Sequence, residues 1–431
     1  MKRNSSRNKR NTRKKTGSVS RRTRPSAVLG YSLNVFPDET TKELWRTLRD
    51  QAIPIQRESF ESEPFPIEMR LSGEMACELT ADAAQRKRLS NFLQANSLEI
   101  VTLNAFVPLS FHEANVKEKV YLPRWDEGRE RLAYTLACAD LLAELGSSRA
   151  PYLSLSVPAG ILKRDLSATH LEQSAAAFAV ALARFASHAH QLWKRTKRWC
   201  VLALEAEPGL TCERTDELIE FFQTALDVYG AGWLAKNESS CGSLDAARRL
   251  LRQFIGINFD TCHQLVEGED LRLAVQLIRS AGISIFKVHV SNCLLVRNPS
   301  KRPKEVKRLK NFYSQSKFLH QTTSFRANGS AFVLDLPAAW REEHRRAFFG
   351  SEVRELRVHY HMPLLPDSGS ATMLEEVRAF LRWFARSRSG KCPLIIETYT
   401  WLEQLRADRV KKSEALRRNI VREIAEVRRW I

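Results

Sequence analysis

Residues 255–291 read IGINFDTCHQLVEGEDLRLAVQLIRSAGISIFKVHVS, and this stretch decides the fold. Two short runs rich in Ile, Val and Phe, at 255–260 and 283–291, flank a segment at 268–281 whose apolar residues recur at helical spacing. Two strands joined by a helix are expected to run parallel, because a parallel pair needs a long crossover connection. The stretch therefore predicts one βαβ unit.

The same alternation extends over most of the chain. The eight predicted strands are Leu29–Val35, Ile67–Ser72, Ile100–Phe106, Tyr152–Val157, Cys200–Glu207, Ile255–Asp260, Ile283–Ser291 and Leu394–Thr398. The predicted helices are 39–52, 80–95, 130–146, 170–195, 214–229, 244–253, 268–281 and 404–430. Eight such units favour an α/β fold of the (β/α)8 TIM-barrel type over an open, doubly wound sheet. No glycine-rich GxGxxG or GxxxxGK[ST] loop follows a predicted strand, which disfavours a nucleotide-binding fold.

One connection is much longer than the others. About a hundred residues separate the seventh and eighth predicted strands, more than a βα loop requires. We expect an insertion at about 293–365 within a barrel domain of residues 27–431, and no second domain with its own core. Residues 1–26 are predicted to form a basic, disordered tail.

Composition and charge exclude several classes of protein. The chain has 431 residues, 43% of them hydrophobic and 27% charged, which is typical of a soluble globular protein. No apolar run reaches the length of a membrane-spanning helix. Eleven of the 68 basic residues lie in residues 1–25, which contain no acid, so the rest carries 57 basic against 49 acidic groups. Nucleic-acid binding is therefore expected only through the tail, which could instead contact anionic lipid or merely aid solubility.

The eight cysteines form no CxxC pair. No secretory signal precedes them, and we expect reduced thiols in a cytoplasmic protein.

Polar residues at the strand ends are the candidates for chemistry, since active sites of such barrels lie at the carboxyl ends of the strands. The fifth to eighth predicted strands end in or contain Glu205 and Glu207, Asp260 and His263, His289, and Glu397. Singly, each acid could cap a loop or pair with an arginine, and His289 could be a satisfied core imidazole. Together, Glu205, Asp260, His289 and Glu397 would form an oxygen-rich shell with one imidazole, which suits a divalent Mn, Mg, Co or Zn ion.

His359 and His361 would share one face if their segment is extended, or form an exposed loop pair. His112, in the loop after the third predicted strand, is a weaker candidate, which could equally be an ordinary surface histidine.

The order of these strand-end residues resembles that of the xylose-isomerase-like TIM barrels, a superfamily of sugar isomerases, epimerases and endonuclease IV-type repair enzymes. The resemblance implies metal binding by Glu205, Asp260, His289 and Glu397. It also implies that His263 contacts the substrate or, as in multi-metal members, a second ion.

A closer resemblance, over nearly all of residues 28–430, is to the EboE metabolite-traffic family. It is carried by Gly30-Tyr31-Ser-Leu-Asn34, Thr102-Leu-Asn104-Ala-Phe106, Leu204-Glu205-x-Glu207-Pro208-Gly209, Asp260-x-Cys262-His263, Leu319-His320-Gln321, His359-x-His361-x-Pro363 and Glu397-Thr398-Tyr399-Thr400-Trp401. That family belongs to a gene cluster associated with moving a secondary-metabolite precursor between compartments in bacteria. The resemblance implies a small metabolite, and other proteins of the same cluster, as partners.

The resulting hypothesis is a metal-dependent isomerase or epimerase acting on a hydroxylated or keto metabolite. Glu205 and Glu397 would act as acid and base, as in related epimerases. The residues expected to position substrate are Glu207, His263, His359, His361 and His112.

Two alternatives stay open at this point. An endonuclease IV-like phosphodiesterase would use the same fold, although fewer His and Asp ligands can be placed here. A non-catalytic carrier or assembly partner is favoured by Phe36, which stands where the family implies a polar His.

Overall fold

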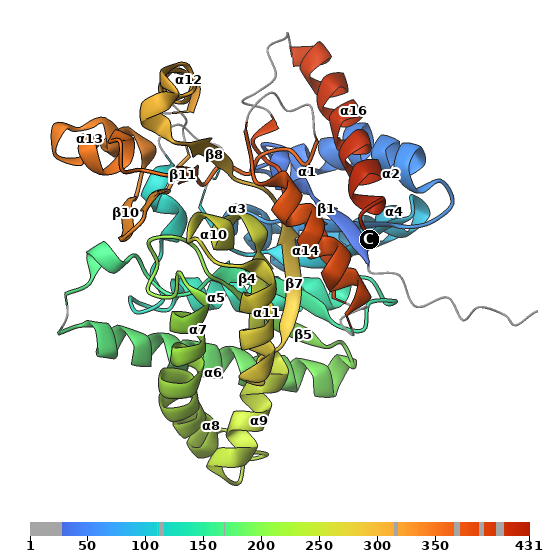
Figure 1. The fold of residues 1–431 in the computed structure, drawn as a ribbon. Helices are drawn as coiled ribbons and strands as arrows, with labels where there is room; N and C mark the ends of the chain where they lie inside the picture. Colours follow the sequence, from blue (N-terminus) through green and yellow to red (C-terminus); the bar gives the residue numbers. More distant parts are fainter. Residues whose placement is uncertain are drawn as a thin grey trace, which may run out of the picture.

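Eight parallel strands close into a barrel in the computed structural model of the protein (Figure 1). The barrel strands are β1 (Leu29–Ser32), β2 (Phe65–Arg70), β3 (Leu98–Asn104), β4 (Leu153–Pro158), β5 (Cys200–Glu205), β6 (Ile255–Asp260), β7 (Ile285–Val290) and β12 (Leu394–Ile396). They follow one another around the barrel in chain order, and β12 closes it by pairing with both β7 and β1. All eight predicted strands are confirmed, and the fold is a (β/α)8 TIM barrel.

The structure describes most of the chain. The described residues are 28–109, 111, 116–167, 169–313, 318–365, 371–387, 392–401 and 409–431. The predicted tail at 1–26 lies outside them, so its order stays a prediction.

Helices surround the barrel and bury apolar side chains against the strands or against one another. They are α1 (Thr41–Thr47), α2 (Ile53–Phe60), α3 (Gly73–Ala81), α4 (Ala83–Ala95), α5 (Glu130–Leu145), α6 (Leu171–Thr196), α7 (Thr215–Phe221), α8 (Ala231–Asn237), α9 (Leu244–Phe254), α10 (Thr261–Val266), α11 (Leu271–Ser280), α14 (Leu374–Arg386) and α16 (Arg409–Arg428). In α16, the stripe of Leu416, Ile420, Ile424 and Val427 is buried, as predicted. This last helix packs beside α2 and completes the shell where the chain begins its barrel (Figure 1).

The long connection between β7 and β12 contains a second, smaller sheet. Its strands, in the order β10-β9-β11-β8, are β8 (Leu294–Arg297), β9 (Thr322–Arg326), β10 (Gly329–Val333) and β11 (Glu355–Val358). Together with α12 (Pro303–Tyr313) and α13 (Glu342–Phe349), it gathers on one side of the barrel, drawn in gold to orange in Figure 1.

The insertion also has an apolar cluster of its own, which the sequence did not lead us to expect. The cluster includes Leu336, Phe348 and Leu356, all buried. Runs such as ELRV and TTSFR mix charged and small polar residues with few apolar ones, so the strands do not stand out in the sequence.

Two general features accompany this architecture. Within the described ranges, no helix is both long enough and apolar enough to cross a lipid bilayer. All eight cysteines are free, and only Cys77 among them is exposed.

Candidate metal and substrate site

The carboxyl ends of β5, β6, β7 and β12 bring four ionisable side chains together. We call Glu205, Asp260, His289 and Glu397 the carboxylate cluster; one potential ligand atom of each lies within 4.8 Å of the others. His289 Nδ1 lies at the centre, 3.0 Å from Glu205 Oε1, 2.9 Å from Glu397 Oε2 and 3.7 Å from Asp260 Oδ2. The strand register contributes to the meeting, because Asp260 pairs with His289 across β6 and β7, and Glu397 directly follows β12, whose Ile395 pairs with His289.

Neighbouring donors fix two of the three carboxylates. Asn34 and Asn104 donate their amide protons to Glu397 Oε1, over 2.6 and 3.3 Å. Asp260 Oδ1 caps α10 by accepting the backbone N–H groups of Cys262 and His263, and it also accepts the Ser291 hydroxyl. The orientation of both groups is therefore set before any ligand arrives.

Two carboxylate oxygens in this cluster have no hydrogen-bond donor. They are Glu205 Oε2 and Asp260 Oδ2, and both are buried. Although burial alone disfavours charge, nearby imidazoles hold the pKa of each carboxyl below its ordinary value, so both groups are charged. Buried, charged oxygens without donors fit a bound cation, and the donor set of three carboxylates and one imidazole suits a divalent ion.

A buried ion pair lies behind His289. Glu68 Oε1 and Oε2 lie 3.0 and 3.2 Å from His289 Nε2, and Glu68 also accepts the Lys287 ammonium. Lys287 in turn donates to the Ser156 hydroxyl over 2.8 Å. Because Glu68 holds the Nε2 proton, the Nδ1 atom of His289 is left to face the carboxylate cluster.

The charge around His289 follows from these contacts. Burial disfavours the imidazolium, but Glu397, Glu68 and Glu205 together raise the pKa of His289 well above its ordinary value. The roles of Glu68 and Lys287 were not predicted from the sequence. The sequence feature that could have indicated these roles is a charged residue in the middle of an otherwise apolar predicted strand.

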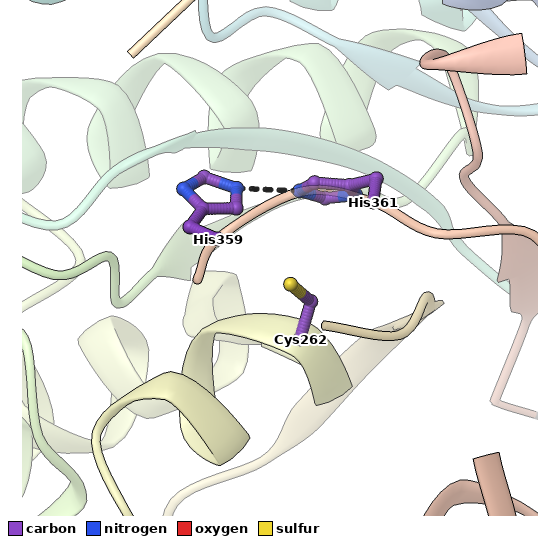
Figure 2. Close-up of side chains that lie close together, drawn as sticks. All are labelled: Cys262, His359 and His361. Carbon is purple, nitrogen blue, oxygen red and sulfur yellow. Dashed lines mark hydrogen bonds between the residues drawn. The ribbon is translucent and has the colours of Figure 1, made fainter. Parts of the chain in front are cut away.

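Three further histidines meet beside the carboxylate cluster, and we call them the imidazole cluster: His263, His359 and His361. His263 lies on α10, whereas His359 and His361 follow β11 directly. His359 Nε2 lies 3.2 Å from His263 Nε2 and 2.7 Å from His361 Nε2. Figure 2 shows the close approach of His359 and His361, with the thiol of Cys262 on the α10 side.

The partners of the Nδ1 atoms determine where the ring protons lie. Nδ1 of His263 faces Ala206 O at 2.9 Å, that of His361 faces Glu397 O at 3.1 Å, and that of His359 faces Gln321 Oε1 at 2.6 Å. Each acceptor takes the Nδ1 proton, so a neutral ring in any of these places carries its lone pair on Nε2. Lone pairs that face one another repel unless a proton or a metal ion lies between them. Burial disfavours the charged ring, but Asp260, Glu207 and Glu205 raise the pKa of His263, so this ring can supply such a proton.

Three sets of residues around the imidazole cluster have potential ligand atoms within 4.8 Å of one another: Cys262, His359 and His361; Glu207, His263 and His359; and Asp260, His263 and His361. Burial raises the pKa of the Cys262 thiol well above its ordinary value, which disfavours the thiolate that would bind a metal. The two sets that contain His263, each completed by a carboxylate and one further histidine, are therefore the better candidates.

Glu207 lies at the edge of the imidazole cluster. Its Oε1 accepts the Gln321 amide over 2.9 Å, and the same amide contacts the Tyr121 hydroxyl over 2.9 Å. Burial raises the pKa of Glu207 to about 7. A large fraction of this carboxyl is consequently protonated at neutral pH and can donate a hydrogen bond.

The remaining sequence candidates fall elsewhere. His112 lies outside the described residues, so its role stays a prediction. Phe36 is buried in the main apolar core and does not line the cavity above the clusters.

Comparisons with known proteins concern the fold alone. No protein-family model and no curated protein matches this chain. Solved structures with a similar fold include the probable 3-DHS dehydratase AsbF of Bacillus anthracis, with 13% identity, coverage of 90% of this chain and 97% of that chain, and a TM-score of 0.43. The IOLI protein with a bound zinc atom has 11% identity, coverage of 93% and 99%, and a TM-score of 0.45. A xylose-isomerase-like TIM barrel protein of Mycobacterium smegmatis in complex with magnesium has 10% identity, coverage of 93% and 97%, and a TM-score of 0.46.

Proposed function

We propose that this protein is a metal-dependent barrel of the EboE metabolite-traffic type, which isomerises or epimerises a small hydroxylated or keto metabolite. The observation that carries the proposal is the pair of donor-free, buried oxygens, Glu205 Oε2 and Asp260 Oδ2, beside His289 Nδ1. Glu205, Asp260, His289 and Glu397 would hold one Mn, Mg, Co or Zn ion. The EboE assignment and its traffic role rest on the sequence motifs.

The chemistry needs a group that takes a proton from carbon and a group that returns it. A bound divalent ion supplies Lewis-acid stabilisation of negative charge on a substrate oxygen. Glu205 would take the proton through the part of its carboxylate that the ion leaves free, because this carboxyl is charged. Glu397 faces it across the cluster and serves as the second acid–base group, while Asn34 and Asn104 keep it oriented.

The imidazole cluster supports a second role at the same mouth. His263, His359 and His361 would hold a second, imidazole-preferring ion such as zinc, or bind substrate through a shared proton. Glu207 would position substrate by donating a hydrogen bond from its protonated carboxyl.

Metal content of purified protein tests the proposal. We expect about one equivalent of bound divalent ion in the wild type after incubation with Mn²⁺, and its loss in the Glu205→Ala, Asp260→Ala double variant. The matched control is Glu127→Ala, Asp245→Ala, which removes two exposed acids outside the site. Equally low metal in wild type and site variant would contradict the proposal.

Exchange of a substrate carbon-bound hydrogen with D₂O separates an enzyme from a carrier. An enzyme loses exchange by several orders of magnitude in Glu397→Ala, whereas a non-catalytic carrier shows no exchange in either form. An endonuclease IV-like activity would instead appear as nicking of abasic DNA that survives deletion of residues 1–25.

A further inference from the structure

The cavity above the two clusters has a polar floor and an apolar wall. It has a volume of about 70 Å³ and is partly open to solvent. Glu205, Glu397 and Asn34 stand on the floor at the strand ends. Phe106, Phe111, Phe318, Leu319 and Tyr399 form the wall.

Three of the wall residues form a continuous aromatic surface from separate parts of the chain. The ring centroids of Phe111 and Phe318 lie 4.9 Å apart, those of Phe318 and Tyr399 5.1 Å, and those of Phe111 and Tyr399 5.5 Å. The Tyr399 ring also lies 4.7 Å from the ring of His361, so the aromatic surface begins where the imidazole cluster ends. A flat apolar group could pack there in the edge or offset contacts that aromatic rings favour.

The cationic side chains that line the cavity are already engaged. Arg70 forms an ion pair with Glu39 over 2.6 Å and donates to the carbonyl of Asp38 over 2.8 Å. Lys117 forms an ion pair with Asp335 over 2.6 Å. Because carboxylates already neutralise both cations, these two side chains give no preference for a phosphate or carboxylate over a neutral ligand.

The polar groups near the floor are also largely committed to one another. Asn34 and Asn104 donate to Glu397, and the Gln321 amide donates to Glu207. Sugar hydroxyls that faced Phe111 and Phe318 would meet carbon atoms and find no hydrogen-bond partner there. Each hydroxyl left without a partner weakens binding markedly, so the wall discriminates against such a ligand.

We infer that the ligand of this site is a neutral metabolite with two adjacent oxygens at one end and an aromatic ring at the other. The oxygens face the carboxylate cluster, and the ring packs against Phe111, Phe318 and Tyr399. This inference rests on the proposed function for its polar end, whereas the aromatic end rests on the wall alone.

A matched pair of α-hydroxy ketones tests the inference. The pair consists of 2-hydroxyacetophenone, which carries a phenyl group, and hydroxyacetone, which carries a methyl group in the same position. D-fructose is the sugar used for comparison. We expect calorimetry with the Mn²⁺-loaded full-length protein to show 2-hydroxyacetophenone binding at least tenfold more tightly than either of the others. Equal affinities, or tighter binding of D-fructose, would overturn the inference.

Wall variants and the bound orientation provide independent readouts. Phe318→Ala should reduce the affinity for 2-hydroxyacetophenone about tenfold and leave that for hydroxyacetone within twofold. Phe332→Ala on β10, which removes a half-exposed ring outside the cavity, should change neither. Phe318→Leu replaces the alanine variant if that variant does not fold.

The orientation of the bound ligand can be measured by NMR. Bound Mn²⁺ should broaden the NMR signal of the ligand CH₂ protons more than that of the para ring proton; the reverse order would contradict the orientation.

Measuring Mn²⁺ binding distinguishes a failure of this inference from a failure of the proposed function. Wild-type protein that binds Mn²⁺ but shows no preference for the phenyl probe overturns the substrate class and leaves the metal site standing. Protein that binds no Mn²⁺ overturns the proposed function and, with it, the polar half of this inference.

Discussion

Replacing Glu68 by Gln tests the most deeply buried electrostatic feature of the barrel. The side chains of Glu68 and Lys287 are fully buried, and the change leaves the Lys287 ammonium without its counter-charge. Breaking a buried ion pair in this way costs about 3–5 kcal/mol of unfolding free energy. An unfolding entropy of about 2.1 cal/mol/K per residue converts this loss to a decrease in Tm of about 3–6 °C.

The same change should weaken metal binding. Glu68 holds the Nε2 proton of His289 at 3.0 Å and so aims Nδ1 at the carboxylate cluster. Loss of such a supporting carboxylate typically lowers metal affinity about 10–100-fold. Competition for Mn²⁺ against a fluorescent chelator measures this change, and differential scanning calorimetry measures Tm.

A double variant separates the two effects. Glu68→Gln, Lys287→Met removes both charges, so most of the lost Tm should return, while the affinity for Mn²⁺ stays low. If Glu68→Gln alone leaves Tm and the Mn²⁺ affinity at their wild-type values, both the ion-pair argument and the orienting role are wrong.

Three further outcomes are expected elsewhere in the chain. His359→Ala should remove one equivalent of bound Zn²⁺ and leave Mn²⁺ uptake unchanged; unchanged Zn²⁺ stoichiometry would contradict the second ion site. Arg131→Met should lower the unfolding free energy by about 3 kcal/mol in urea titrations, because the buried guanidinium donates to the carbonyls of Phe106, Leu122 and Pro123. Burial raises the pKa of Glu267 from 4.5 to about 8, so the folded state holds more protons than the unfolded state between these values. Unfolding free energy should therefore fall as pH rises from about 4.5 to about 8, and Glu267→Gln should flatten that slope; an unchanged slope would show that another group causes it.

The barrel could be predicted because its strands are buried on both faces and appear as short apolar runs between amphipathic helices. The gathering of Glu205, Asp260, His289 and Glu397 followed from the same pattern, since the ends of successive parallel strands meet at one rim. The small sheet of the insertion was not predicted, because its strands are short and partly polar.

Other parts of the site depend on contacts that no local pattern contains. Glu68 and Lys287 come from strands that do not pair, and they meet only inside the closed barrel. The aromatic wall joins Phe111, Phe318 and Tyr399 from three segments far apart in sequence. Their proximity depends on the way the insertion folds back over the barrel mouth.

The balance of buried charge inside the barrel explains why the carboxylate cluster favours a divalent ion. Four carboxylates, those of Glu68 and of Glu205, Asp260 and Glu397, surround two buried cations, Lys287 and the imidazolium of His289. His263, whose pKa Asp260, Glu207 and Glu205 also raise, adds at most a third. An excess of negative charge in a buried site is costly, and a divalent ion offsets it. An ion at the carboxylate cluster must displace the proton from His289 Nδ1, so metal binding should tighten as pH rises and release a proton. Because Glu68 keeps the Nε2 proton in place, the ring remains oriented toward the cluster when that proton leaves.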